Sequence, residues 1–332
     1  MKQTTVHVWR GAGVESVHRV SVAVADAKGK LRAWSGDALL PTLARSAIKP
    51  FQALPLVEDG GLLRWGITDP ELALCAASHN AEPFHVTAAL SLLARIGQDE
   101  EALACGPQRP MHPESALALD RAGRLPTRIH NNCSGKHAGM LALARLHGWP
   151  TEGYQRSDHP VQRRMRETFA LWAEVAPETL SEGVDGCGIP TFGASLSVVA
   201  GAFARLASAA QTAGTAAHRV VSAMTRHPEY VAGTGRACTD VMRAARGRVL
   251  VKIGAEGVYG AGWPEAGFGL ALKVEDGAMR AAPPALVAVL RALGWPLEED
   301  AALSAHAEPA VKNTRNETVG KLTVDVRLER SR

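Results

Sequence analysis

The order of hydrophobic patterns along this 332-residue chain predicts an α+β fold, in which both ends of the chain build one antiparallel sheet. Residues 4–10 and 16–24 alternate apolar and polar side chains, as half-buried strands do. The far end of the chain has similar segments at 269–274 and 322–328. The sequence between the two ends is rich in Ala and Leu, so we expect a largely helical region there.

The expected elements follow one another in a simple order. A turn at 26–29 leads to a third strand at 31–34, and a turn at 275–277 ends the strand that precedes it. Helices are expected at 46–58, 81–96, 135–147, 160–174, 197–211, 216–226, 236–246 and 283–294. The sequence has no internal repeat and no low-complexity linker, so we predict a single domain over 1–332 with an internal helical subdomain that is not sharply bounded.

Composition excludes several classes of protein. Hydrophobic residues make up 46% and charged residues 21%, as in globular domains. The net charge of +4 comes from 37 basic and 33 acidic residues without a basic run, so we expect no nucleic-acid partner. The five cysteines, an odd number, do not indicate a disulfide framework. Neither a membrane span nor an export signal is evident, and we therefore expect a cytoplasmic protein.

The first chemically suggestive segment is Ser-Ala-Ile-Lys at 46–49. On a helix, positions three apart share a face, so the Lys49 amine can meet the Ser46 hydroxyl. A lysine whose pKa is lowered by burial and by neighbouring cations can take the serine proton and create a nucleophile. The pattern is common by chance, however, and Pro50 disfavours helical backbone at Lys49, so the helix must tolerate this proline or begin near it.

Two further segments extend the pattern. Ser78-His79-Asn80 precedes an expected helix, and Lys252-Ile253-Gly254 follows the apolar strand 249–251. Ser-x-x-Lys, Ser-x-Asn and Lys-Thr-Gly occur in this order in penicillin-binding enzymes and serine β-lactamases. Ile253 lacks the threonine hydroxyl, which weighs against β-lactam recognition. Alternatively, Ser78 is a helix N-cap and Lys252 a solvated residue at a strand end.

A second group of candidate residues contains two cysteines and a lysine. The loop that ends in Cys133-Ser134-Gly135-Lys136 is not a phosphate loop, because the required glycine and Ser/Thr are missing. Glycines flank Cys187, which suits a tight turn that exposes its sulfur. Two thiolates from separate loops are suited to zinc, whereas the alternative is that both cysteines are small buried hydrophobes. We expect the remaining cysteines in the core: Cys75, Cys105 and Cys238.

Longer motifs give the chain a family resemblance. They are Ser-Ala-Ile-Lys-Pro-Phe-Gln at 46–52, Ser-His-Asn at 78–80, His-Asn-Asn-Cys-Ser-Gly-Lys-His-Ala-Gly-Met-Leu at 130–141, Asp-Gly-Cys-Gly-Ile-Pro-Thr-Phe at 185–192, His-Pro-Glu-Tyr-Val-Ala-Gly-Thr-Gly-Arg at 227–236 and Lys-Ile-Gly-Ala-Glu-Gly at 252–257. Together they resemble the type-3 L-asparaginases, also called the asparaginase II family, over roughly residues 5–328. The resemblance implies a fold like that of serine β-lactamases and penicillin-binding proteins.

The resemblance also implies an activity and a site. The implied reaction is hydrolysis of L-asparagine to L-aspartate and ammonia through an acyl-enzyme, in a cytoplasmic homodimer. The resemblance implies that Ser46 is the nucleophile and is paired with Lys49, and that Ser78 and Lys252 form a second pair. The implied zinc site, which would support substrate binding rather than water activation, comprises Cys133, Lys136 and Cys187. The residues expected to bind substrate are Arg45, Asn80, His137, Asp185 and Glu256.

Two alternative functions are compatible with the same residues. One is another cytoplasmic serine amidase or peptidase of the penicillin-binding fold, although cell-wall substrates lie outside the cytoplasm. The other is a catalytically silent relative that binds an amino acid, although both Ser/Lys pairs are intact in this sequence.

Overall fold

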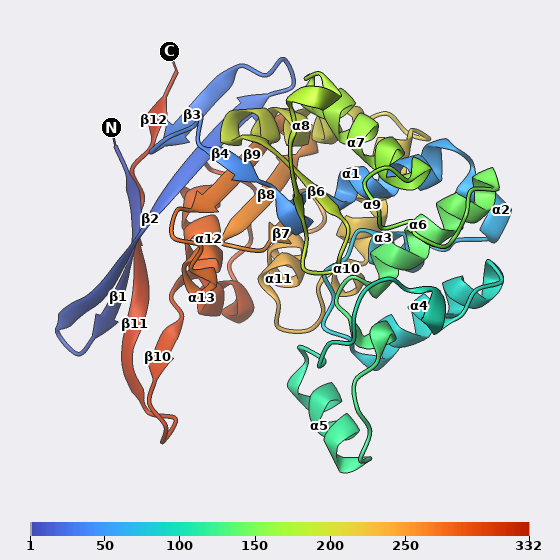
Figure 1. Cartoon of the computed structure of the whole chain (residues 1–332). Coiled ribbons are helices and arrows are strands. Elements are labelled where there is room, and N and C mark those ends of the chain that lie inside the picture. Colours follow the sequence, from blue (N-terminus) through green and yellow to red (C-terminus); the bar gives the residue numbers. More distant parts are fainter. Residues whose placement is uncertain (1, 332) are drawn as a thin grey trace. The chain divides into compact units, whose positions relative to one another are not determined.

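The computed structural model describes residues 2–331 and divides into two compact units (Figure 1). The first unit comprises residues 1–47, 193–211 and 240–332, and the second comprises 48–192 and 212–239. Each unit is described below by itself. The prediction of a single domain over the whole chain stays a prediction.

The first unit is built on an antiparallel sheet with the strand order β10-β11-β1-β2-β9-β8-β7, in which β3 pairs with β2 and with β12. The strands are β1 (Thr4–Arg10), β2 (Gly13–Asp26), β3 (Leu31–Ser35), β7 (Leu250–Gly254), β8 (Val258–Trp263), β9 (Phe268–Val274), β10 (Ala310–Lys312), β11 (Thr318–Asp325) and β12 (Glu329–Arg330). In Figure 1 the blue strand β1 lies beside the red strand β11. The prediction that both chain ends form one antiparallel sheet is therefore confirmed.

Helices cover the sheet of this unit. Helix α8 (Leu196–Ala209) packs on β2, β8 and β9, and α12 (Ala282–Ala292) packs on β1, β8, β9 and β11. Helix α13 (Ala301–Ala307) packs against α12. Strand β7 is buried at every residue. A short strand, β4 (Pro41–Leu43), pairs with the end of β6 (Pro190–Ser195) and leads into the segment that carries Ser46.

The second unit is largely helical, as predicted. Its helices are α1 (Lys49–Glu58), α2 (Gly61–Trp65), α3 (Asp69–Cys75), α4 (Pro83–Arg95), α5 (Pro113–Arg121), α6 (Ser134–His147), α7 (Pro160–Ala173), α9 (Ala216–Arg226), α10 (Pro228–Val231) and the start of α11 (Ala237–Ala244). Helix α6 is buried from Ser134 to Ala144 because it packs against α1, α2, α3, α4 and α7. No helix within residues 2–331 is long and apolar enough to cross a membrane.

The expected helices match observed ones to within a few residues, with one informative difference. A 3₁₀ turn, η1 (Arg45–Ile48), precedes α1, so the α-helix begins at Lys49 and not at residue 46. Pro50 then occupies the first turn of the helix, where its missing N–H breaks no helical hydrogen bond. The strand expected at 322–328 is also displaced, because β11 ends at Asp325.

Candidate active site

Lys49 is the centre of a buried polar cluster in the second unit. Its side chain is fully buried, and its ammonium donates hydrogen bonds to Ala77 O at 2.6 Å, Ser78 Oγ at 2.9 Å and Cys133 Sγ at 3.0 Å. These contacts use all three N–H donors of the ammonium, as a buried charge requires. The structure therefore brings together Lys49 and Ser78, which the sequence had placed in different pairs.

Ser78 lies in the loop between α3 and α4. Its backbone N–H donates to Val231 O at 2.9 Å, and the next residue, His79, donates to Asn132 O at 3.0 Å. These two bonds fix the loop and hold the Ser78 hydroxyl against Lys49. The helix that follows is capped by Glu82 and not by Ser78, so the N-cap interpretation of Ser78 is wrong.

Two cysteines and a lysine meet beside this cluster. Cys133 and Lys136 lie at the start of α6, and Cys187 lies in the loop between β5 (Ser181–Val184) and β6. The Lys136 ammonium donates to Cys187 Sγ at 2.9 Å, and the two cysteine side chains share a hydrogen bond. The exposed fractions of the three side chains are 4%, 2% and 5% for Cys133, Lys136 and Cys187. The predicted zinc-binding residues are thus in contact with one another.

The charges of this group are unevenly divided. The hydrogen bond from Cys133 lowers the pKa of Cys187 to about 4, and the Lys136 charge lowers it further against the effect of burial. The same hydrogen bond, together with burial, raises the pKa of the Cys133 thiol to about 12. Burial alone would lower the pKa of Lys136, but the two sulfurs and Asp185 outweigh it and raise that pKa. The cluster therefore holds one thiolate between a thiol and an ammonium.

The donor set fits a zinc ion. Two sulfurs that are buried and already within reach of each other suit a thiophilic cation, and Lys136 supplies a nitrogen once it loses its proton. Within residues 2–331 no group of three or more His, Cys, Asp and Glu side chains is arranged to hold a metal. The third protein donor in this set is the amine of Lys136.

His137 follows Lys136 in α6 and is fully buried. Its Nδ1 lies 2.5 Å from the Tyr154 hydroxyl, which also accepts a hydrogen bond from Ala104 N at 2.9 Å. Burial, assisted by the charge of Lys136, lowers the pKa of His137 to about 3, so the ring is neutral. Its Nε2 has no hydrogen-bond partner in the part of the chain that the structure describes. This nitrogen is therefore available to a bound molecule.

Ser46 lies in the first unit, on the 3₁₀ turn η1. This turn lies against the end of β7, because a Cβ on Gly254 would be 2.7 Å from Ala44 O and 3.2 Å from Ala47 N. Alternate residues of a strand point to the same face, so Lys252 points toward the face on which the turn lies. Lys252 is fully buried, and its ammonium donates to Ile253 O at 2.8 Å. The interpretation of Lys252 as a solvated lysine is wrong.

The other predicted substrate-binding residues differ in their surroundings. Arg45, on the same turn as Ser46, is half-buried and has a left-handed backbone with φ of 50°. Glu256 is exposed on the β7–β8 hairpin, and its carbonyl accepts a hydrogen bond from Lys273. In the second unit Asp185 accepts a hydrogen bond from Gly186 N at 2.8 Å and contributes to the raised pKa of Lys136. Asp185 thus lies beside Cys133, Lys136 and Cys187, which together form the thiol–lysine group.

Asn80 has a partner that the sequence reasoning did not place in the site. Arg236 donates from Nη1 to Asn80 Oδ1 at 2.7 Å, while Asn80 Nδ2 donates to Thr234 O at 3.1 Å. The segment 227–236 contains glycines around polar residues, which was the available signal. Nothing local assigns Arg236 to Asn80, however, because the two residues are 156 positions apart.

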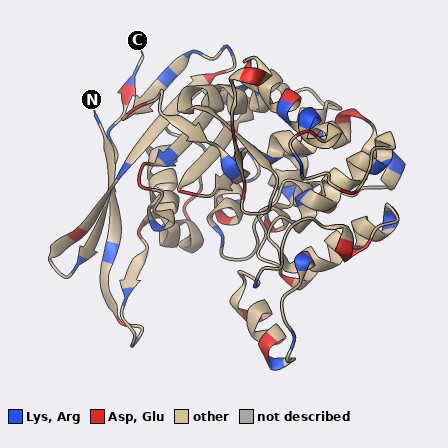
Figure 2. Cartoon of the chain, in the orientation of Figure 1, with Lys and Arg blue, Asp and Glu red and all other residues tan. Residues whose placement is uncertain are grey.

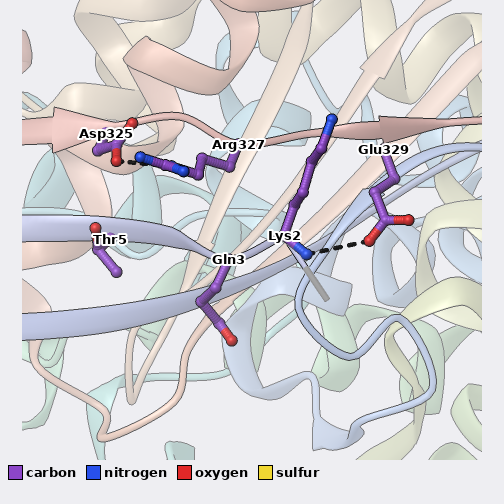
Figure 3. Close-up of a pocket in the computed structure, with 6 residues that line it drawn as sticks. All are labelled: Lys2, Gln3, Thr5, Asp325, Arg327 and Glu329. Carbon is purple, nitrogen blue, oxygen red and sulfur yellow. Dashed lines mark hydrogen bonds and ion pairs between the residues drawn. The ribbon is translucent and has the colours of Figure 1, made fainter.

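A surface hollow of the first unit lies elsewhere (Figure 3). It is lined by Lys2, Gln3, Thr5, Asp325, Arg327 and Glu329. The Arg327 guanidinium pairs with Asp325 at 2.8 Å, and the backbone N–H of Lys2 donates to Glu329 at 3.2 Å. No predicted catalytic, substrate-binding or metal-binding residue lines this hollow. Figure 2 shows basic and acidic residues interspersed along both units.

Comparison with known proteins identifies the family. A family model described as L-asparaginase II matches residues 6–324, and the chain belongs to this family. The match covers almost the whole chain, including the Ser46, Ser78, Cys133, Cys187 and Lys252 segments. A search of the curated proteins finds no match.

Solved structures give weaker likenesses. Mglu in its native form aligns with a TM-score of 0.46 at 17% identity, covering 85% of this chain and 66% of that one. Mglu in its glutamate form aligns with a TM-score of 0.44 at 17% identity, and the alignment covers 85% of this chain and 62% of that one. A β-lactamase from Mycobacterium bovis aligns with a TM-score of 0.41 at 16% identity, and the alignment covers 84% of this chain and 95% of the β-lactamase. The chain thus spans just under two thirds of these Mglu chains.

Proposed function

We propose that this protein is an amide hydrolase that converts L-asparagine and water to L-aspartate and ammonia. The observation that carries the proposal is membership of the L-asparaginase II family across residues 6–324. The buried contact of Lys49 with Ser78 supports it, because Ser/Lys amide hydrolysis needs a lysine within hydrogen-bond reach of a hydroxyl. We also propose that the protein forms a homodimer and is located in the cytoplasm.

The proposed reaction proceeds through an acyl-enzyme. With Lys49 in its neutral amine form, Ser46 attacks the side-chain amide carbon while the Lys49 amine takes the serine proton, and the oxyanion is stabilised by backbone N–H donors. The hydrogen bond from Lys49 to Ser78 gives that proton a route toward the amide nitrogen, which leaves as ammonia. Lys252 adds a positive charge on the strand face next to the Ser46 turn. Water then cleaves the β-aspartyl ester by the reverse path, and Ser46 regains its proton.

The remaining groups would position the substrate. Asp185 is suited to the substrate ammonium, and the partnerless Nε2 of His137 is suited to a hydrogen bond with a polar substrate atom. Zinc held by Cys133, Lys136 and Cys187 would supply positive charge for orienting the substrate. Arg45, Asn80 and Glu256 complete the set of residues that we propose to bind substrate.

The test is an ammonia-release assay with L-asparagine and L-glutamine, on the purified protein and on Ser46→Ala. We expect turnover of L-asparagine by the unmodified protein and a loss of at least about 10³-fold in kcat for the variant, because covalent attack is removed. Circular dichroism and thermal unfolding establish that the variant is folded. Turnover by Ser46→Ala near that of the unmodified protein would remove Ser46 as nucleophile.

Two further outcomes separate the alternative functions. Binding of L-asparagine without ammonia release would identify a silent binding protein. Covalent labelling by a fluorescent penicillin, without turnover of L-asparagine, would identify a peptidase or β-lactamase of the penicillin-binding type.

A further inference from the structure

Arg236 is a half-buried cation that no carboxylate within residues 2–331 neutralises. Its contacts are Asn80 Oδ1 at 2.7 Å and the sulfur of Met111 at 3.5 Å. Arg219 and Arg226, on helix α9, instead form ion pairs with Asp69. A guanidinium has five N–H donors, so most of the hydrogen-bonding capacity of Arg236 remains available.

The loop that carries Arg236 is fixed in place. Gly233 has a φ of 110°, and a Cβ there would lie 2.5 Å from Glu82 Oε1 and 2.6 Å from Asn80 Nδ2. The Glu82 carboxylate accepts from Thr234 N at 2.7 Å and from Thr234 Oγ1 at 2.8 Å. Only glycine allows this close approach, and the two hydrogen bonds between Thr234 and Glu82 hold the loop against the segment that begins at Ser78. The guanidinium is therefore preorganised.

Arg236 also lies close to Ser78 and Lys49 within the second unit. Asn80, which it contacts, is two residues from Ser78, whose hydroxyl is bonded to Lys49. The ammonium groups of Lys49 and Lys136 are already engaged with acceptors in their own clusters. Among the described residues, Arg236 differs from Lys49 and Lys136 in keeping spare donors and in having no anionic partner.

We propose that Arg236 binds the α-carboxylate of the substrate, so that the site selects free amino-acid amides over amides that lack a carboxylate. This inference rests on the proposed function, and it concerns a residue that the proposed mechanism does not use. The planar fork of a guanidinium matches a carboxylate with two parallel hydrogen bonds. The bond to Asn80 fixes one N–H and orients the rest of the fork.

The first test compares Arg236→Gln with the unmodified protein on two substrates. One is L-asparagine, and the other is 3-aminopropanamide, which is L-asparagine without its carboxylate. We expect kcat/KM for L-asparagine to fall by about 10- to 100-fold, mainly through KM, because a hydrogen-bonded charge pair is lost. The value for 3-aminopropanamide should not change. Arg226→Gln, which removes a surface arginine ten residues away, should leave both values unchanged.

The substrate comparison separates recognition from a structural role. An equal loss on both substrates would mean that Arg236 only supports Asn80, and unchanged kinetics on L-asparagine would mean that it has no part in the site. Either result overturns the inference.

A binding measurement keeps this inference separate from the proposed function. Calorimetry of L-asparagine with Ser46→Ala and with the double variant Ser46→Ala/Arg236→Gln measures recognition without turnover. If the unmodified protein releases no ammonia, the proposed hydrolysis fails, but binding weakened about 10- to 100-fold in the double variant still supports Arg236. Equal binding to the two variants, or binding to neither, overturns the role of Arg236.

Discussion

Lys49 combines full burial with three hydrogen bonds, and this combination explains how a charged side chain is accommodated inside the second unit. Each ammonium proton has an acceptor, and two of the acceptors, Ser78 Oγ and Cys133 Sγ, are chemically reactive groups. Leaving these acceptors without a donor costs about 1–3 kcal/mol each. Lys49 therefore connects Ser78 to the thiol–lysine group.

We predict that Lys49→Met lowers kcat for L-asparagine by about 10²- to 10⁴-fold, because the variant keeps the length of the side chain but cannot carry a proton. The measurement is ammonia release together with thermal unfolding, which records the cost of the lost hydrogen bonds. Lys321→Met is the control, since Lys321 forms an exposed ion pair with Glu308. A Lys49→Met enzyme with more than a tenth of the original kcat would contradict the proton-transfer role.

A second prediction at the scale of residues concerns the zinc content of the thiol–lysine group. Protein purified without chelator should contain about one zinc per chain, and Cys187→Ser should contain little, because one of the two sulfur ligands is lost. Elemental analysis measures this directly. Binding at a free zinc concentration 100 times Kd stabilises the fold by about 2.7 kcal/mol, so chelation should lower the unfolding temperature. Cys75→Ala, a buried cysteine outside the cluster, should keep its metal. Equal zinc in Cys187→Ser would exclude this site.

The helices and strands differ in how well the sequence pattern predicts them. The β1 strand alternates between buried and half-buried residues, so its periodicity predicts it. Strand β8 is buried along most of its length and contains Gly260 and Gly262, so it has neither alternation nor strong strand propensity. Helices such as α10, of four residues, are too short to show a period. Sequence patterns thus identify long amphipathic elements and miss short or wholly buried ones.

The same reasoning applies to the site. Ordered motifs identify the candidate segments, because each motif is local in the sequence. The contact between Lys49 and Ser78 joins residues 29 positions apart, and that between Arg236 and Asn80 joins residues 156 apart. Such pairs depend on how α1, the α3–α4 loop and the loop before α11 come together. Only the folded chain specifies them.

The contact between β7 and the η1 turn leads to a prediction at the scale of elements. Gly254→Val would place a Cβ 2.7 Å from Ala44 O, so the turn that carries Ser46 must move. Overpacking of this kind costs about 1–3 kcal/mol, and a small displacement of a reacting group lowers kcat/KM by up to about 10²-fold. Thermal unfolding and ammonia release measure the two effects.

Gly13→Val is the matched control for that variant. Gly13 begins β2, and a Cβ there meets only Arg10 O, at 3.9 Å. We expect this variant to keep its activity. Full activity of Gly254→Val would show that the position of the Ser46 turn does not depend on the end of β7.

At the scale of the whole molecule, each unit contains a carboxylate whose pKa is lowered by hydrogen bonds. In the first unit, burial alone would raise the pKa of Glu275, but bonds from Ser21, Gln3 and Arg19 outweigh burial and lower it. In the second unit the two bonds from Thr234 lower the pKa of Glu82 in the same way. Acid should therefore destabilise both units.

The direction of this pH dependence follows from proton linkage. A carboxyl whose pKa is lower in the folded than in the unfolded chain adds stability above its unfolded pKa, and this stability is lost as pH falls through the folded pKa. We expect the unfolding temperature to fall below about pH 6.5, where unfolded histidine binds protons that His79, His85 and His137 do not bind in the fold, and to fall more steeply below about pH 4.5, where unfolded glutamate begins to bind protons. Glu275→Gln and Glu82→Gln should each lower the unfolding temperature at pH 7 and flatten its fall in acid, because each removes one linked proton. Glu152→Gln, at an exposed side chain, should change neither quantity. Variants that keep the full acid dependence of the original chain would show that these two carboxylates do not contribute to it.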